Sequence, residues 1–223
     1  MNLKNIRNGT VALLLCSFIV LHNSRAAGGK GEGRAAEEKP VEILVAYYSL
    51  TGNTEQMAKG VIEGANRVAG VLARLKKVDE VSQKELEAAD GIVLGCPTYF
   101  ANIPGKMKEV LDDWAWKMKV DFTDKVGGAF ATGGGQVGGK EHVVVSLVMF
   151  MLSNRMLVAG PLYQNEQTGG VWGEAGAAAM TGPLDPGVSQ NELDSARRLG
   201  ERIARLAKKL KRGEVPDLSQ RKL

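Results

Sequence analysis

The sequence predicts an α/β fold in which a doubly wound parallel sheet carries helices on both faces. Short β-branched runs alternate along the chain with segments whose apolar residues repeat at helical spacing, which is typical of βαβ units. The 223 residues, 44% hydrophobic and 24% charged, have the composition of one globular domain. In sheets of this kind, ligands bind outside the carboxyl ends of the strands. The loops that follow the strands are therefore the first places to search for a site.

Five segments carry the strand pattern, and turn residues or helical repeats separate them. In chain order they are Val41–Tyr47, Val71–Val78, Gly91–Gly95, Val126–Ala131 and Met156–Gly160. After the last and weakest of them, residues 161–189 are rich in Gly, Pro and Ala and predict a long connection. Loops of that length in compact domains usually carry function.

Amphipathic helices are predicted after the first and third strands and at the end of the chain. Their apolar stripes are Met57, Val61, Ile62, Ala65 and Val68; Met107, Val110, Leu111 and Trp114; and Leu193, Ala196, Leu199, Ile203, Leu206 and Leu210. The segment Glu141–Leu152 is apolar nearly all round. We therefore expect it to form a helix that is well buried or that lies at a subunit contact.

The first 26 residues predict a secretory signal peptide. Lys4 and Arg7 precede an apolar run, Val11–Leu21, which is shorter than the roughly 20 residues that span a bilayer. Ser24 and Ala26 suit a cleavage site, so we expect an exported, periplasmic or secreted protein without a stable membrane anchor. The alternatives are an uncleaved leader that tethers the protein to a membrane, or a cytoplasmic protein. Residues 27–40 predict a flexible linker, 41–212 the folded domain and 213–223 a polar tail.

Charge and cysteine usage exclude several classes of protein. The formal net charge is +4, but residues 1–26 hold three basic residues and no acid, which leaves 26 basic and 25 acidic residues. This near neutrality argues against a nucleic-acid partner. Beyond the leader the sequence holds one cysteine, Cys96, and one histidine, His142. We therefore expect no metal site, and we expect Cys96 to be a small buried residue.

The loop after the first strand, Ser49–Thr54, is the most informative part of the chain. It has hydroxyls at positions 49, 51 and 54 and a glycine at 52, and it leads directly into a helix. The N–H groups and the positive dipole end of a helix N-terminus bind phosphate without any basic side chain. An ordinary helix cap is the alternative interpretation.

Two further loops have the chemistry of a ring site. After the third strand, Pro97 and Pro104 bracket an aromatic segment, which indicates a fixed loop that suits a flat heteroaromatic ring. After the fourth strand, the glycines of Phe130–Gln136 allow close approach to a ring edge. Together the three loops indicate a mononucleotide with a planar head group, and FMN fits. The string Gly134–Lys140 is not a P-loop, because Glu141 stands where Ser or Thr would hold magnesium.

These segments carry a family resemblance that covers about residues 41–212. Ser49–Thr54 is similar to the flavodoxin phosphate loop, and Pro97–Asn102, Phe130–Gln136 and Gly169–Gly173 resemble the WrbA family of NAD(P)H:quinone oxidoreductases. The resemblance implies a flavodoxin-like fold with five parallel strands in the order 2-1-3-4-5 and noncovalent FMN. It also implies NAD(P)H as reductant, a quinone as substrate and a homo-oligomer, either a dimer or a tetramer.

The resemblance also implies site residues. No catalytic side chain is named, since the flavin N5 carries the chemistry. Asn154 and Arg155 stand where the family has a histidine over the flavin, and with Trp116 they are the predicted substrate-binding residues. Thr98, Phe100 and Gln136 are the residues expected to tune the ring. The predicted cofactor-binding residues are Ser49, Leu50, Thr51, Gly52, Asn53, Thr54, Pro97, Thr98, Tyr99, Phe100, Ala101, Asn102, Ala131, Thr132, Gly133, Gly134, Gly135 and Gln136.

The sequence departs from the family at several points, and two other functions stay open. Ala101 replaces a glycine of the family, and Asp79–Asp90 is shorter than the usual insertion. A flavodoxin-type one-electron carrier is one alternative, although such carriers tend to be strongly acidic and this chain is nearly neutral. A flavin-binding protein with little turnover is the other.

Overall fold

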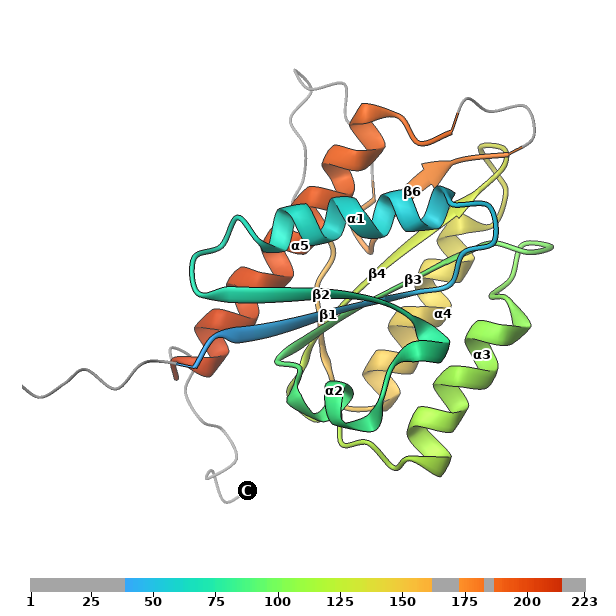
Figure 1. Cartoon of the computed structure of the whole chain (residues 1–223). Coiled ribbons are helices and arrows are strands. Elements are labelled where there is room, and N and C mark those ends of the chain that lie inside the picture. The colour runs from blue at the N-terminus through green and yellow to red at the C-terminus, as the bar shows by residue number, and fades with distance from the viewer. Residues whose placement is uncertain (1–38, 162–172, 183–186, 214–223) are drawn as a thin grey trace, which may run out of the picture. The chain divides into compact units, whose positions relative to one another are not determined.

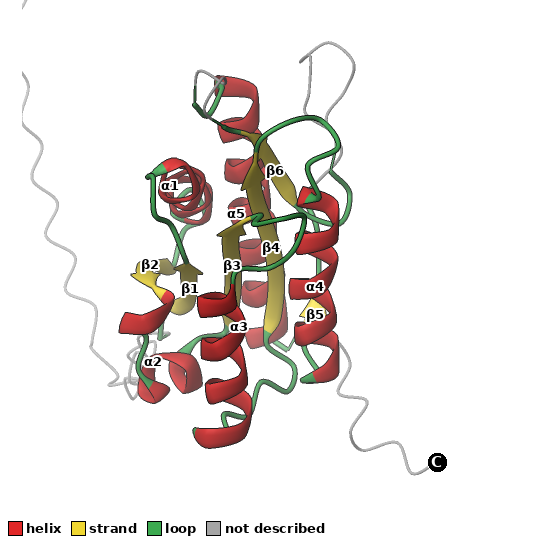
Figure 2. Cartoon of the chain, turned by 90° about the vertical axis from the view of Figure 1, so that its right-hand side faces the viewer, coloured by secondary structure: helices red, strands yellow, loops and turns green. Residues whose placement is uncertain are grey.

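Four parallel strands form most of the sheet and confirm the predicted topology. The computed structural model describes residues 39–161, 173–182 and 187–213. These strands are β1 (Val41–Tyr47), β2 (Val71–Lys77), β3 (Gly91–Pro97) and β4 (Val126–Gly133). With β2 at one edge and β5 at the other, the order is β2-β1-β3-β4-β5, and every pairing is parallel (Figure 2).

The fifth position of the sheet holds two short strands instead of the single one predicted. β5 (Leu157–Val158) pairs with the start of β4, and β6 (Ala177–Met180) pairs with its end, from Phe130 to Gly133. The expected strand Met156–Gly160 is thus only two residues long, and the expected connection 161–189 contains a strand. The pattern missed β6 because a run of alanines has no β-branched residue and weak strand propensity.

The helices cover both faces of the sheet (Figures 1 and 2). α1 (Asn53–Ala65) and α5 (Gln190–Lys211) pack on one face, and α2 (Gln83–Ala88), α3 (Gly105–Asp112) and α4 (Lys140–Ser153) pack on the other. A short 3₁₀ turn, Val78–Glu80, and a π-helical turn, Asp113–Lys117, complete the regular structure of the described residues. The order of elements is that of repeated βαβ crossovers.

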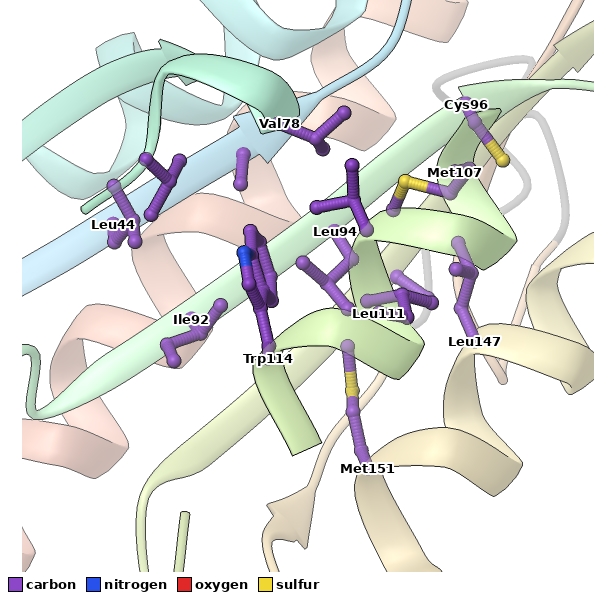
Figure 3. Close-up of a cluster of buried hydrophobic side chains, with 14 of the residues drawn as sticks. Leu44, Val78, Ile92, Leu94, Cys96, Met107, Leu111, Trp114, Leu147 and Met151 are labelled. Atoms are coloured by element: carbon purple, nitrogen blue, oxygen red, sulfur yellow. The ribbon is translucent and has the colours of Figure 1, made fainter. Parts of the chain in front are cut away.

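Each sheet face has its own apolar core because side chains alternate along the strands. Figure 3 shows the core on the α3 and α4 side, where the fully buried Trp114 lies beside Ile92 and Leu94. On the opposite face, Val45 and Val93 pack against α1 and α5. Both faces of β1, β3 and β4 are therefore covered, as is typical of a parallel sheet.

Helix α4 is buried along one stripe only, so the expectation of burial all round is wrong. Val143 and Leu147 are fully or nearly fully covered, whereas Val145, Met149 and Leu152 are 48%, 54% and 51% exposed. The physical reason is that α4 lies in an outer layer, and an outer helix contacts the sheet along one side. The second expectation, a subunit contact, stays a prediction.

The predicted leader, most of the linker and most of the polar tail lie outside the described residues. The cleavage of residues 1–26 and the export of the protein therefore stay predictions. Among the described residues, no helix is both long enough and apolar enough to cross a membrane.

Helices α1 and α5 approach each other closely enough that only glycine fits at their crossing. A Cβ on Gly64 would lie 1.8 Å from the carbonyl oxygen of Arg197, and one on Gly200 would lie 1.9 Å from that of Val61. Backbone thus packs on backbone between the two helices. This contact fixes the last turns of α1, the helix that follows the predicted phosphate loop, against α5.

Gly64→Ala is expected to destabilise the protein by about 1–3 kcal/mol, because the added methyl forces the helices apart. The change in the free energy of unfolding is measured by urea denaturation followed by circular dichroism. Gly105→Ala is the matched control, since a Cβ there meets nothing within 4 Å. Equal losses in the two variants would contradict the close-packing argument.

Candidate functional site

A cavity of about 410 Å³ opens at the carboxyl ends of β1, β3, β4 and β6. The right-hand side of Figure 1 shows the loops after these strands meeting around the start of α1. The volume is within the roughly 300–1,000 Å³ of typical small-molecule sites. Its lining residues are Leu50, Thr51, Asn53, Thr54, Pro97, Thr98, Tyr99, Thr132, Gly133, Gly134, Thr181 and Gly182.

The loop Ser49–Thr54 presents the start of α1 to this cavity. Gly52 adopts the left-handed region at φ 91°, and its N–H donates to Ser49 Oγ at 3.1 Å. The carbonyl of Gly52 accepts the first helical bond, from the Gln56 N–H at 2.9 Å. A Cβ at Gly52 would meet nothing within 4 Å, so open space lies in front of the loop. The exposed N–H groups of the first helix turn are therefore free to bind an anion.

A buried hydroxyl pair joins the phosphate loop to β4. Thr54 Oγ1 and Thr132 Oγ1 lie 2.7 Å apart, and the two residues are 2% and 1% exposed. One hydroxyl donates to the other, and the acceptor of that bond keeps its own hydrogen for another acceptor. Because both residues line the cavity, a phosphate oxygen there would be a suitable partner.

The loop after β3 is closed by a tight backbone turn. The N–H groups and carbonyls of Tyr99 and Asn102 exchange hydrogen bonds of 2.9 and 3.0 Å. Between them, Phe100 and Ala101 have φ angles of 52° and 60°, in the left-handed region that favours glycine. A glycine at position 101, which the resemblance implies, would adopt this conformation without strain. The turn leaves the Phe100 side chain fully exposed.

The ring-facing walls are tied to each other by backbone bonds. The Thr98 N–H donates to the Thr132 carbonyl at 2.7 Å, and the Thr181 N–H donates to the Gly133 carbonyl at 2.9 Å. The Tyr99 ring contacts the Tyr48 ring edge to face, with centroids 6.4 Å apart. The loops after β3 and β4 and the end of β6 thus form one connected wall.

Two lining residues, Thr181 and Gly182, were not predicted from the sequence. They follow β6, and Glu192 fixes that strand because its carboxylate accepts from the N–H groups of Met180 and Ser189, each at 2.6 Å. Glu192 also belongs to a capping box with Ser189 at the start of α5. The Ser-x-x-Glu spacing was visible in the sequence and marks this helix start.

Most of the predicted cofactor-binding residues come together. Ten line the cavity: Leu50, Thr51, Asn53, Thr54, Pro97, Thr98, Tyr99, Thr132, Gly133 and Gly134. Seven lie on the same loops without lining it: Ser49, Gly52, Phe100, Ala101, Asn102, Gly135 and Gln136. Ala131 is fully buried within the sheet, between Cys96 and Ala178, so it does not face the cavity.

The predicted substrate-binding residues lie away from the cavity of their own chain. Trp116 is 80% exposed in the π-helical turn that follows α3. Asn154 ends α4, where its side chain donates to the Phe150 carbonyl, and Arg155 contacts Thr123. Helices that follow parallel strands run back toward the amino ends of those strands, so their last residues lie at the opposite edge of the sheet from the cavity. Only a neighbouring chain could bring these side chains to a flavin.

Cys96 has the buried, structural character expected of it. The residue is fully covered, and burial raises the pKa of its thiol to about 12. A thiol with that pKa is almost entirely protonated at neutral pH and is a poor nucleophile. Figure 3 shows its side chain near Met107 in the apolar core. Among the described residues, no group of three or more His, Cys, Asp or Glu could hold a metal ion.

The residues around the cavity fit FMN. Neutral hydroxyls and helix N–H groups gather at one end, where Gly52 leaves open space, and they suit a phosphate monoester. Pro97, Tyr99 and the backbone of Gly133 and Gly134 form the remaining walls, which suit a flat ring.

Comparisons with known proteins agree with this site. A family model described as NADPH-dependent FMN reductase matches residues 52–168. A protein of Solidesulfovibrio magneticus named "NAD(P)H dehydrogenase (quinone)" is 34% identical in an alignment 205 residues long, which covers 77% of this chain and the whole of that protein. A protein of Geotalea uraniireducens with the same name is 32% identical over 206 residues, with 77% of this chain and all of that protein covered.

Solved structures give the same result for the fold. A flavodoxin, WrbA-like protein from Agrobacterium tumefaciens has a TM-score of 0.59 and 26% identity, and the match covers 76% of this chain and 98% of that one. An archaeal flavodoxin, 21% identical, has the same TM-score over 75% of this chain and 99% of its own, and supports the fold alone. The flavodoxin-like fold and the WrbA-type resemblance are thereby confirmed, and the chain belongs to the NADPH-dependent FMN reductase family.

Proposed function

We propose that the protein is an FMN-dependent oxidoreductase that takes a hydride from NAD(P)H and passes two electrons to a quinone. The observation that carries this proposal is the cavity at the strand ends, which combines a neutral phosphate cradle with ring-facing walls in a member of this family. The names of its relatives support the choice of nicotinamide and quinone.

The chain would hold FMN without any charged side chain in the cavity lining. The first N–H groups of α1 and the hydroxyls of Thr51 and Thr54 would bind the phosphate. Pro97, Tyr99 and the Gly133–Gly134 backbone would position the ring and exclude water from it. Bound FMN supplies the hydride and electron chemistry, so no side-chain acid or base is needed.

The mouth of the cavity carries exposed apolar side chains that suit a planar substrate. Leu50 is 71% exposed and Tyr99 is 37% exposed, and both line the cavity. Phe100 follows Tyr99 and is fully exposed. Burying such side chains under a nicotinamide or quinone ring would remove apolar surface from water. The two substrates would therefore use the same open side in turn.

Anaerobic mixing of the FMN-loaded protein with NADH or NADPH tests the proposal. We expect rapid loss of the absorbance of oxidised flavin without a band of one-electron-reduced flavin, and recovery of that absorbance when benzoquinone is added. Stable FMN binding without bleaching would contradict the enzyme function. It would leave the flavodoxin-type carrier, which a one-electron donor then tests, or a flavin-binding protein with little turnover.

Thr132→Val is expected to weaken FMN binding about fivefold or more, since removing one hydrogen bond costs roughly 1 kcal/mol. The variant keeps the shape of the side chain but leaves Thr54 without its hydroxyl partner. The dissociation constant is measured by quenching of FMN fluorescence. Thr132→Ser is the control and should bind like the unchanged protein; weak binding by both variants would mean that the hydroxyl pair is not responsible.

We propose also that the protein is a homo-oligomer that associates through the outer face of α4. Val145, Met149 and Leu152 lie at helical spacing on that face and are about half exposed. Asn154 and Arg155 directly follow the helix, so this contact would place them beside a neighbouring chain. Apolar helix faces of this kind are typical of protein interfaces.

Met149→Glu is expected to shift the protein toward the monomer, because the charge would be buried at the contact. Size-exclusion chromatography with light scattering measures the mass. Leu72→Glu is the matched control, since Leu72 is an exposed leucine of β2, away from α4, and should leave the mass unchanged. A monomeric unchanged protein, or no shift in Met149→Glu, would contradict this interface.

A further inference from the structure

Lys140 is a buried cation with an unusual environment. It is only 5% exposed and is the first residue of α4, where the helix dipole is positive. Its Nζ donates to the Gly135 carbonyl at 2.5 Å. No carboxylate in the described part of the chain forms an ion pair with it. Two positive features thus share one buried position, and no carboxylate of the described residues lies within ion-pair distance of the ammonium group.

The ammonium group lies behind one wall of the cavity. Gly135, its hydrogen-bond partner, directly follows Gly133 and Gly134, which line the cavity. The Lys140 stem also contacts this wall, because its Cγ lies 3.4 Å from the position that a Cβ on Gly133 would occupy. Lys140 itself is not among the lining residues, so it acts on the cavity through the glycine loop and through its charge.

An uncompensated buried ammonium group is costly, and a hydrogen bond to a carbonyl does not require a charge. A neutral amide donor could hold Gly135 equally well. The hydrogen bond to the Gly135 loop therefore does not explain why a charged side chain stands at position 140. It would be compensated if negative charge developed in the cavity on the other side of the glycine wall.

Hydride transfer to a flavin produces such a charge. The C–H bond of the dihydronicotinamide breaks, and two electrons and one proton move to the flavin ring, where a new N–H bond forms. The nicotinamide becomes a cation, and the flavin gains one negative charge. We propose that Lys140 is a positioning residue whose charge favours the reduced over the oxidised form of bound flavin. This inference rests on the proposed function.

The test compares the binding of FMN in its two redox forms. The dissociation constants of oxidised FMN and of dithionite-reduced FMN are measured anaerobically for the unchanged protein, Lys140→Gln, Lys140→Met and Lys140→Arg. Lys140→Gln keeps an N–H donor for Gly135 but removes the charge, whereas Lys140→Arg keeps the charge. Circular dichroism verifies that each variant is folded.

We expect the ratio of the oxidised to the reduced dissociation constant to fall about tenfold in Lys140→Gln and Lys140→Met, because the charge that favours the reduced form is removed. In Lys140→Arg the ratio of the two dissociation constants should stay close to that of the unchanged protein. For a two-electron couple, a tenfold fall corresponds to a reduction potential about 30 mV lower. The potential of the bound flavin provides an independent measurement.

Lys125→Gln is the matched control. Lys125 is a half-buried lysine whose Nζ donates to the carbonyls of Glu87 and Ala89, before the start of β4 and so at the opposite edge of the sheet. An unchanged ratio in Lys140→Gln, or an equal fall in Lys125→Gln, would overturn the role of Lys140 while leaving the proposed function intact. Failure of the unchanged protein to bind FMN in either form would instead overturn the proposed function.

Discussion

Strand β4 is the element on which the rest of the structure depends. It pairs with β3 along one edge and with both β5 and β6 along the other, and all eight of its residues are buried. Every wall of the cavity is fastened to its carboxyl end. Thr132 bonds to Thr54 and to the Thr98 N–H, and Gly133 bonds to Thr181. A shift of β4 by one residue would separate all of these contacts at once, since side chains alternate between the two faces.

The core of the fold and the phosphate loop could be predicted because they depend on local patterns. β1 has the predicted bounds, and the lengths of β2, β3 and β4 differ from those predicted by one to two residues at their carboxyl ends. The loop from Ser49 to Thr54 lies at the cavity for the same reason, since a strand that leads into a helix fixes where that helix begins. These features need only the periodicity and the turn chemistry of neighbouring residues.

The remaining features depend on contacts between distant segments. β6 consists of three alanines and Met180, and this segment becomes a strand because the edge of β4 is available for pairing. Thr181 reaches the cavity through that pairing and through Glu192, whose carboxylate accepts from the N–H of Met180, twelve residues earlier in the chain. The family resemblance predicts that Trp116, Asn154 and Arg155 bind substrate. Within one chain, however, these residues lie at the opposite edge of the sheet from the cavity, because the helices that precede them run toward the amino ends of the strands.

The hydrogen bonds of Glu192 affect when the cavity can form while the chain is being synthesised. The end of β6 is held by a carboxylate that belongs to α5, the last helix of the described chain. A nascent chain that has not yet passed residue 192 therefore lacks one wall of the flavin cavity, even when β1, β3 and β4 are already made. We therefore expect tight retention of FMN only once nearly the whole domain has emerged, which would couple flavin loading to the final stage of folding.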